Sequence, residues 1–217
     1  MRRLPLTLLV ACLAGFAQPE TVGYNILPAP GARFTLTVEK TGLLSGKKHV
    51  FVFDAYHGVF HFDAEAPERS RVELSIQAAS ATCIDKWVSE KDLKKIQAYA
   101  LNDMLRAGSY PELHFAAAGA VRKGAGDFEV EGTLTIRGIA RPVKVTVALR
   151  ESSGAISSLS GRAVVRLKDY GLKPPTAALG TIGTKNEMLV EFVLLPARQV
   201  ARVEKAVTTG NRKDSAR

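Results

Sequence analysis

The stretch VEGTLTIRGIARPVKVTVALR, residues 130–150, decides the fold of this chain. Its apolar residues occupy every second position, which places them on one face of two successive strands: Val130, Leu134, Ile136, Val143, Val145, Val147 and Leu149. Apolar residues with a period of two are expected in a strand when one face of the sheet is buried and the other is exposed to solvent. We expect the connection Arg137–Pro142 to be a turn, in which Gly138 can take a positive φ and Pro142 can start the next strand. With the preceding segment YPELHF, residues 110–115, the stretch predicts three successive strands.

The same alternation recurs along most of the chain and predicts an all-β fold. Strands are expected at 34–39, 49–56, 59–62, 71–77, 110–115, 127–137, 141–150, 160–168 and 187–195. We interpret 49–56 and 59–62 as one hairpin interrupted at His57-Gly58, which leaves about eight antiparallel strands. A sheet of that size can close into a barrel and hold one small ligand.

A change of period marks one helix among these strands. Ser89 suits the N-cap position, and Leu93 begins an apolar stripe at helical spacing. Gly108 is well placed to end the helix. The pattern therefore predicts a helix over roughly 89–106, inserted between strands 3 and 4 of an eight-stranded antiparallel barrel.

The chain is basic, with a formal net charge of +9 and a pI of about 9.7. Such a charge suits an anionic partner, but most of the charges are spread over polar strand faces, which favours a solvated surface. Basic residues are in local excess in the tail 197–217, which contains six Lys or Arg residues and two acidic residues. This tail lacks apolar periodicity and aromatic residues that stack on bases. We expect it to be disordered, to bind no nucleic acid and to make weak membrane-surface contact.

The N-terminus predicts export. Arg2-Arg3 precedes the apolar run Leu4–Phe16, and small residues occupy the two positions that a signal peptidase inspects before a cut near Ala17. We expect a signal peptide over 1–17, followed by a Pro- and Gly-rich segment over 18–32 that is a linker or a loose first strand. The mature protein is then periplasmic or secreted.

Cys12 offers an alternative anchor. The sequence Leu9-Val10-Ala11-Cys12 resembles a bacterial lipoprotein box, in which Cys12 would carry the lipid. If the signal peptide is instead removed, Cys83 is the single remaining cysteine and no intramolecular disulfide can form. We expect Cys83 to behave as a small, partly buried apolar residue.

Six segments taken together resemble the YceI-like family of bacterial exported proteins. They are TGLLSGKKH (41–49), SRVELSIQAAS (70–80), SYPELHF (109–115), VEGTLTIRGIARPVKV (130–145), KDYGLKPP (168–175) and GTIGTKNEMLVEF (180–192). The resemblance covers roughly residues 33–196. It implies a lipocalin-like, eight-stranded antiparallel barrel with a helix and an elongated apolar interior. It also implies binding of a long polyisoprenoid or other apolar lipid, such as a quinone, without catalysis.

The chain departs from the family pattern at three places. Many relatives carry a second histidine beside the one that matches His49, where this chain has Lys48 and Val50. Arg137 stands where the hairpin of relatives usually has histidine, and Asn186 stands where the late strand usually begins with aspartate. A headgroup contact that relatives make at these positions is therefore altered here.

Twelve apolar residues are candidate ligand contacts because each can face the barrel interior. They are Phe34, Leu36, Phe51, Phe53, Val72, Leu74, Ile76, Phe115, Val130, Leu134, Val145 and Val147. The alternative is that these side chains simply fill the barrel, as they do in some eight-stranded barrels. The protein would then be a non-catalytic stress or interaction protein of the envelope. The sequence leaves both interpretations open.

Other chemistries are weakly supported by the sequence. His57 and His61 would lie about 13 Å apart in an extended strand, and no cysteine or carboxylate stands beside them at metal-ligand spacing. A metal-binding module is therefore a less favoured alternative, and no metal ligand is assigned. The sequence has no GxSxG, P-loop or HExxH motif. We expect no enzyme, no catalytic residues and no cofactor.

Overall fold

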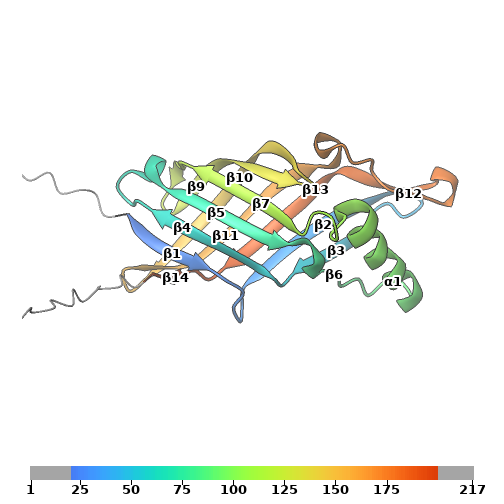
Figure 1. Cartoon of the computed structure of the whole chain (residues 1–217), viewed down its shortest axis with the longest axis horizontal. Coiled ribbons are helices and arrows are strands. Elements are labelled where there is room, and N and C mark those ends of the chain that lie inside the picture. Colours follow the sequence, from blue (N-terminus) through green and yellow to red (C-terminus); the bar gives the residue numbers. More distant parts are fainter. Residues whose placement is uncertain (1–20, 200–217) are drawn as a thin grey trace, which may run out of the picture.

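The computed structural model describes residues 21–199 and is dominated by one antiparallel sheet (Figure 1). Its strands are β1 Val22–Ile26, β2 Arg33–Gly42, β3 Lys48–Phe53, β4 Tyr56–Phe62, β5 Arg71–Gln77, β6 Ala81–Cys83, β7 Glu112–Ala118, β8 Val121–Gly124, β9 Asp127–Ile136, β10 Ile139–Ser152, β11 Ala155–Arg166, β12 Thr176–Ala177, β13 Ile182–Leu194 and β14 Ala197–Arg198. The helix α1, Glu90–Tyr99, continues into a π-helical turn, Ala100–Leu105. Short 3₁₀ turns lie at Pro67–Arg69, Ala78–Ser80, Leu167–Tyr170 and Ala178–Gly180. No helix in the described part of the chain is both long and apolar enough to cross a membrane.

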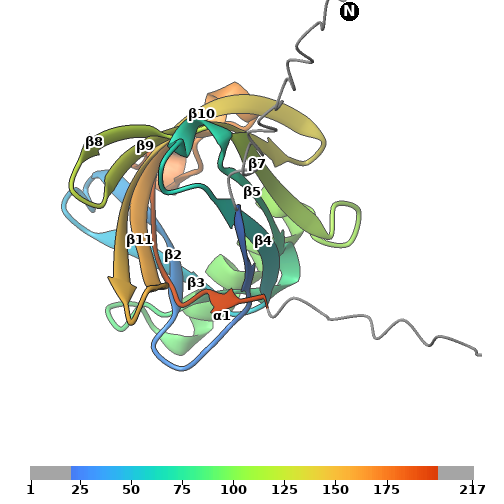
Figure 2. The ribbon, with the colours of Figure 1, turned by 90° about the vertical axis from the view of Figure 1, so that its left-hand side faces the viewer.

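The sheet curls round on itself into a barrel-like shape. Its strand order is β14-β1-β4-β5-β7-β9-β10-β11-β13-β2-β3-β6, with β8 and β12 added beside β9 and β13. Figure 2 shows the strands arranged as a ring when the molecule is viewed along its length. Within residues 21–199 no ladder joins β6 to β14, so hydrogen bonds do not run continuously round the ring. The all-β, barrel-like fold class expected from the sequence is confirmed.

The stretch 130–150 forms the hairpin of β9 and β10. Val130 lies opposite Val145, and Ile136 lies opposite Ile139 across a two-residue turn. Both turn residues, Arg137 and Gly138, have positive φ values of 52° and 76°. Positive φ at both central positions gives the turn a twist that matches that of the flanking strands. Gly138 therefore lies in the turn as predicted, but the turn is shorter than the expected Arg137–Pro142, because Ile139 to Pro142 already pair with β9.

The predicted hairpin of 49–56 with 59–62 is wrong. β3 pairs with β2 and β6, whereas β4 pairs with β1 and β5, so the two segments lie in different parts of the sheet. Gly58 does not break a strand but lies inside β4. A Cβ on Gly58 would approach the carbonyl oxygen of Glu73 in β5 to 2.4 Å, so glycine allows the close pairing of these strands.

The position of the helix among the strands also differs from the prediction. α1 follows the sixth strand and precedes the seventh, rather than lying between strands 3 and 4. The difference arises because β1 was not counted as a strand, because the three-residue β6 was not foreseen, and because β3 and β4 are separate strands. The N-cap prediction is confirmed, since the Ser89 side chain accepts a hydrogen bond from the Asp92 backbone N–H. The helical segment ends at Leu105, before Arg106 with its left-handed φ of 50°.

The boundaries of the sheet lie outside the predicted barrel domain 33–196. The expected linker 18–32 contains β1, which pairs along its whole length with β4. The expected tail begins with β14, in which Arg198 lies opposite Tyr24. β1 has five residues and β14 has two, and pairing with distant segments places both in the sheet. The predicted signal peptide 1–17, with Cys12, and the tail from residue 200 onward lie outside the described residues.

Candidate functional site

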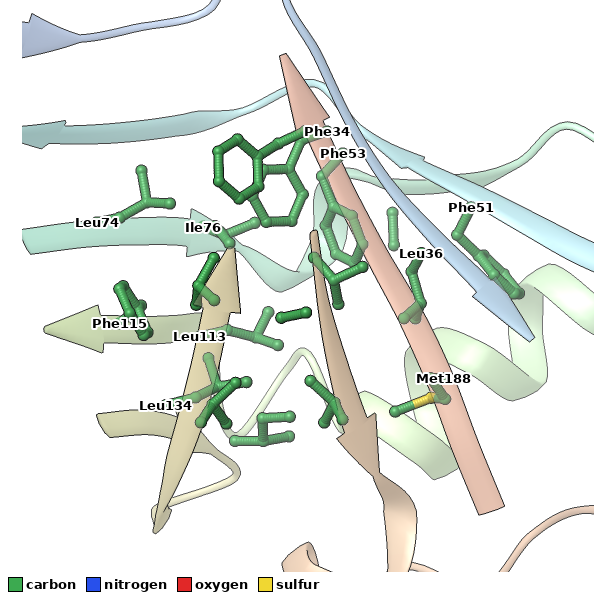
Figure 3. A pocket seen from close by; sticks show the side chains of 18 of the residues that line it. Phe34, Leu36, Phe51, Phe53, Leu74, Ile76, Leu113, Phe115, Leu134 and Met188 are labelled. Carbon is green, nitrogen blue, oxygen red and sulfur yellow. The ribbon is translucent and has the colours of Figure 1, made fainter. Parts of the chain in front are cut away.

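The sheet encloses an apolar cavity of about 510 Å³. Inward-facing side chains of the long strands form its wall, and α1 and its π-helical extension contribute Ile96, Ala100, Met104 and Leu105. Figure 3 shows side chains from different strands pointing into this common space, among them Phe53, Leu113 and Met188. The volume lies within the range of small-molecule sites in proteins.

All twelve residues predicted to face inward line this cavity: Phe34, Leu36, Phe51, Phe53, Val72, Leu74, Ile76, Phe115, Val130, Leu134, Val145 and Val147. Strand alternation was enough to place them, because one face of each strand must be buried. Their side chains do not fill the interior. That they contact a ligand stays a prediction.

Two aromatic rings lie over glycines of neighbouring strands. A Cβ on Gly132 would approach Cζ of Phe115 to 2.4 Å, and a Cβ on Gly161 would approach Cζ of Phe192 to 2.5 Å. Each glycine therefore provides the space in which a phenyl ring rests against the sheet. The Phe192 ring in turn stacks on Phe34, with centroids 6.0 Å apart and an interplanar angle of 11°. These rings form part of the wall and leave the centre of the cavity open.

The cavity reaches the surface at one end. Its exposed lining residues are Lys95 and Tyr99 of α1 and Thr176 and Ala177 of β12. Figure 1 shows α1 and β12 at the same end of the molecule. No described lining residue at the far end is exposed: Phe62 is buried, and Phe60 and Ala120 are half-buried. We call the opening between α1 and β12 the mouth.

The charged side chains that line the cavity are cationic. They are Lys40, on the inward face of β2, and Lys95 at the mouth, and no Asp or Glu of the described residues lines the cavity. Burial lowers the pKa of Lys40, because a desolvated ammonium is less stable. Lys40 has no ion-pair partner within residues 21–199. An anionic or strongly polar group entering the mouth would therefore be attracted to Lys40.

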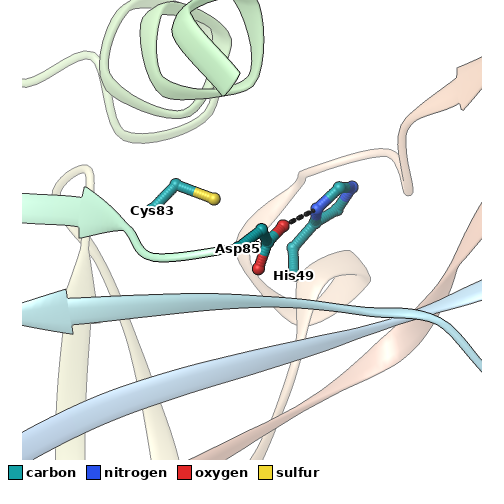
Figure 4. Close-up of side chains that lie close together, drawn as sticks. All are labelled: His49, Cys83 and Asp85. Carbon is teal, nitrogen blue, oxygen red and sulfur yellow. Dashed lines mark hydrogen bonds and ion pairs between the residues drawn. The ribbon is translucent and has the colours of Figure 1, made fainter. Parts of the chain in front are cut away.

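The structure brings together His49, Cys83 and Asp85, a group that sequence reasoning missed (Figure 4). One ligand atom from each lies within 4.8 Å of the others. His49 Nδ1 lies 2.5 Å from Asp85 Oδ2, and the Val50 backbone N–H donates to Asp85 Oδ1 at 2.9 Å. The only local signal is that Cys83 and Asp85 share one face of an extended segment. Their distance from His49 in the sequence hides the contact.

The chemistry of this cluster favours a hydrogen-bonded pair over a metal site. An ionised Asp85 only accepts hydrogen bonds, so His49 donates from Nδ1. Burial raises the pKa of the Cys83 thiol to about 11, so without a metal ion the thiol is protonated at neutral pH. Trp87 stacks on His49 with centroids 5.3 Å apart and fixes the ring. The result is an oriented imidazole in the cavity wall.

The other histidines do not assemble into a metal site in the described part of the chain. His57 and His61 lie on β4, opposite Ser75 and Arg71, and His114 lies on β7 opposite Thr135. None of them belongs to a group of three close metal-ligating side chains among residues 21–199.

Comparisons with known proteins agree with this architecture. The sequence profile of the YceI-like domain matches residues 25–194. A UPF0312 protein of Shewanella oneidensis is 28% identical over 153 residues, covering 68% of this chain and 76% of the relative.

Two solved structures share the fold. BcnA of Burkholderia cenocepacia superposes with a TM-score of 0.56 at 17% identity, over 76% of this chain and 96% of BcnA. A polyisoprenoid-binding domain from Saccharophagus degradans, implicated in plant cell wall breakdown, superposes with a TM-score of 0.54 at 13% identity, over 81% of this chain and 98% of that domain. The profile match spans most of the chain, and the chain therefore belongs to the YceI-like domain family.

Proposed function

We propose that this protein binds a long apolar lipid, isoprenoid-like or quinone-like, inside its cavity and sequesters or carries it in the cell envelope. The observation that carries the proposal is the open apolar cavity with one mouth. In an interaction protein that used the barrel only as a scaffold for its surface, side chains that filled this space would raise stability, since cavities are costly. The interaction protein with a filled barrel is therefore the weaker candidate.

The energetics favour a chain-like ligand. Each methylene group transferred from water contributes about 0.8 kcal/mol, so ten buried methylenes contribute on the order of 8 kcal/mol before the costs of binding. The wall offers few hydrogen-bonding groups, and those it has lie mostly towards the mouth, such as Lys40, His49 and Thr184. This distribution suits an amphiphile whose apolar tail lies deep and whose polar end stays near the opening.

The comparisons lend support. The Saccharophagus degradans domain with the same fold is described as polyisoprenoid-binding. At 13% identity this similarity shows a shared fold. That the present chain binds a similar ligand is part of the proposal.

The envelope location rests on the N-terminal sequence. The Arg2-Arg3 pair and the apolar run after it are typical of a signal peptide, and Cys12 offers the lipoprotein alternative. Intact mass measurement of the protein purified from its own cell envelope separates the two. A first residue near 18 supports cleavage, and a lipidated Cys12 supports anchoring.

The lipid proposal is tested by extraction and titration. Organic-solvent extraction of the purified protein, followed by mass spectrometry, should release an apolar lipid, and polyprenyl compounds or quinones should bind in titration. The variant Val72→Trp places a large ring in the cavity wall and should weaken binding at least about tenfold, because the ring takes the volume that the ligand needs.

The matched control is Val164→Trp, since Val164 is a strand valine that is 54% exposed on the outer face. It should bind like the parent, and circular dichroism should show that both variants keep the β fold. If no lipid co-purifies and no polyprenyl compound or quinone binds, the proposal fails.

A further inference from the structure

The two most exposed large apolar side chains of the described residues lie at the mouth end. Leu43, in the β2–β3 turn, is 78% exposed, and Leu179, in the β12–β13 loop, is fully exposed. The Leu43 backbone N–H donates to the Thr181 carbonyl oxygen at 3.0 Å, which holds the two loops side by side. Figure 1 shows both loops at the end that carries α1 and β12. We call Leu43 and Leu179 the leucine tips.

The backbone that presents Leu179 is unfavourable in isolation. Ala178 and Leu179 have positive φ values of 49° and 56°, a region that L-residues with a Cβ avoid. The following residue, Gly180, also has a positive φ, and there the absence of a side chain removes the penalty. A leucine held in a left-handed conformation carries backbone strain, and such strain concentrates at functional positions.

The leucine tips border the opening of the cavity. Thr176 and Ala177, which line the mouth, immediately precede the turn that carries Leu179. On the other loop, Leu43 follows Lys40, which lines the cavity from β2. Anything that contacts both leucine tips therefore also faces the mouth.

The same segments carry a cationic excess. Residues 39–50 and 171–186 contain five lysines (Lys40, Lys47, Lys48, Lys173 and Lys185) and one acidic residue, Glu39. Glu39 is occupied by Lys185 at 2.6 Å and Lys48 at 3.5 Å. Lys47 and Lys173 have no carboxylate partner within residues 21–199. Exposed apolar tips surrounded by lysines are the combination that binds anionic membrane surfaces.

We propose that the mouth end docks on a membrane surface rich in anionic phospholipid, with the leucine tips inserted into the headgroup region and the lysines on the phosphates. This orientation places the cavity opening against the bilayer. The proposal differs from the expectation that the tail 197–217 provides membrane contact. It also does not depend on what the cavity holds, because vesicle binding is measured separately from lipid extraction.

The test is vesicle flotation of the full exported protein. Phosphatidylcholine vesicles with about 30 mol% phosphatidylglycerol should bind it, and pure phosphatidylcholine vesicles should bind it at least about fivefold more weakly, since each lysine near an anionic surface is worth about that factor. The double variant L43S/L179S should lose at least about tenfold in affinity for the anionic vesicles, because two leucine side chains no longer leave water. The control V121S/V164S removes two valines that are 58% and 54% exposed in other parts of the sheet, and it should bind like the parent.

A fluorescence measurement locates the contact independently of affinity. Trp87 is the single tryptophan, so Trp87→Phe gives a silent background. In that background Leu179→Trp should shift its emission to shorter wavelength on anionic vesicles, whereas Val164→Trp should not. Thermal unfolding should be unchanged by the leucine and valine substitutions, since these side chains are exposed. The Trp87→Phe protein is the reference for the fluorescence variants, because Trp87 is half-buried and stacks on His49.

Three results would overturn the docking proposal. The first is an L43S/L179S variant that binds within twofold of the parent. The second is an equal loss in V121S/V164S. The third is that neutralising the basic residues of the tail, Arg202, Lys205, Arg212 and Lys213, abolishes binding while the leucine tips have no effect.

Discussion

Replacing Gly132 by alanine should force the Phe115 ring out of its place on the cavity wall. The added Cβ would lie 2.4 Å and 2.6 Å from two ring atoms of Phe115 and 2.8 Å from the Ala116 carbonyl oxygen. The ring must move by about 1 Å to restore ordinary contact near 3.4 Å. The open space next to the Phe115 ring is the cavity, so we expect the ring to move in that direction.

The expected cost follows from known overpacking effects. Forcing one extra carbon into a packed site typically costs 1–3 kcal/mol, and we expect about 2 kcal/mol for Gly132→Ala. For a chain of this size that lowers Tm by roughly 4–8 °C. In a Phe115→Ala background the same substitution should cost less than about 1 kcal/mol, because only the strain against the Ala116 carbonyl remains.

The assay is urea unfolding of the four proteins in this double-mutant cycle, with Gly108→Ala as a control. A Cβ on Gly108 meets nothing within 4 Å and its φ is not positive, so that variant should keep the parent stability within about 0.5 kcal/mol. Lipid titration adds a second measurement, in which Gly132→Ala should weaken binding through the displaced ring. An equal cost of Gly132→Ala in both backgrounds would refute the reasoning, since the ring would then not be the obstacle.

Three further predictions concern polar and titratable groups. With its pKa raised to about 11 by burial, the Cys83 thiol should react with iodoacetamide at pH 7.5 at least about 100-fold more slowly than in urea, and rapid labelling of the native protein would contradict this. The backbone N–H of Ala66, followed by the charge of Arg69, lowers the pKa of Asp63, so its stabilising contribution is present above pH 4 and is lost as the pH falls through the folded-state pKa. The unfolding free energy of Asp63→Asn should accordingly change less between pH 4.5 and 2.5 than that of the parent, and parallel curves would rule out the role of Asp63. Asp85→Ala leaves the Val50 N–H and His49 without their acceptor and should cost about 1–3 kcal/mol in urea unfolding, whereas a cost below about 0.5 kcal/mol would show that water replaces the carboxylate.

The inward residues could be predicted because side-chain alternation is a local property of a strand. Val130 and Val145 face inward in any antiparallel sheet that buries this face, whatever the order of the other strands. The helix start at Ser89 was likewise predictable, since capping depends on neighbours within one turn.

What the sequence did not reveal depends on contacts between distant segments. The pairing of Tyr24 with Arg198 joins the two ends of the domain, and the two residues of β14 are too few to show a period. His49 and Asp85 come within hydrogen-bonding distance only because β6 lies beside β3. The leucine tips could not be recognised for a similar reason, since Leu43 in TGLLSGKKH and Leu179, just before GTIGTKNEMLVEF, look like ordinary loop residues until the two loops meet.

Whether the barrel is hollow or filled also depends on the register between neighbouring strands. The structure indicates which sequence pattern goes with a hollow barrel. Alternation says that Phe192 points inward, but a phenyl ring pointing inward can either cross the interior or fold back onto the wall. Phe192 lies directly opposite Gly161 in the β11–β13 ladder, and Phe115 lies one diagonal position from Gly132. A glycine beside a phenylalanine lets the ring lie flat on the neighbouring strand, which protects the exposed backbone and keeps the ring out of the centre. Once a register is known, such Phe–Gly neighbours therefore indicate an open barrel, whereas the same phenylalanine beside a β-branched residue would have to stand upright and fill it.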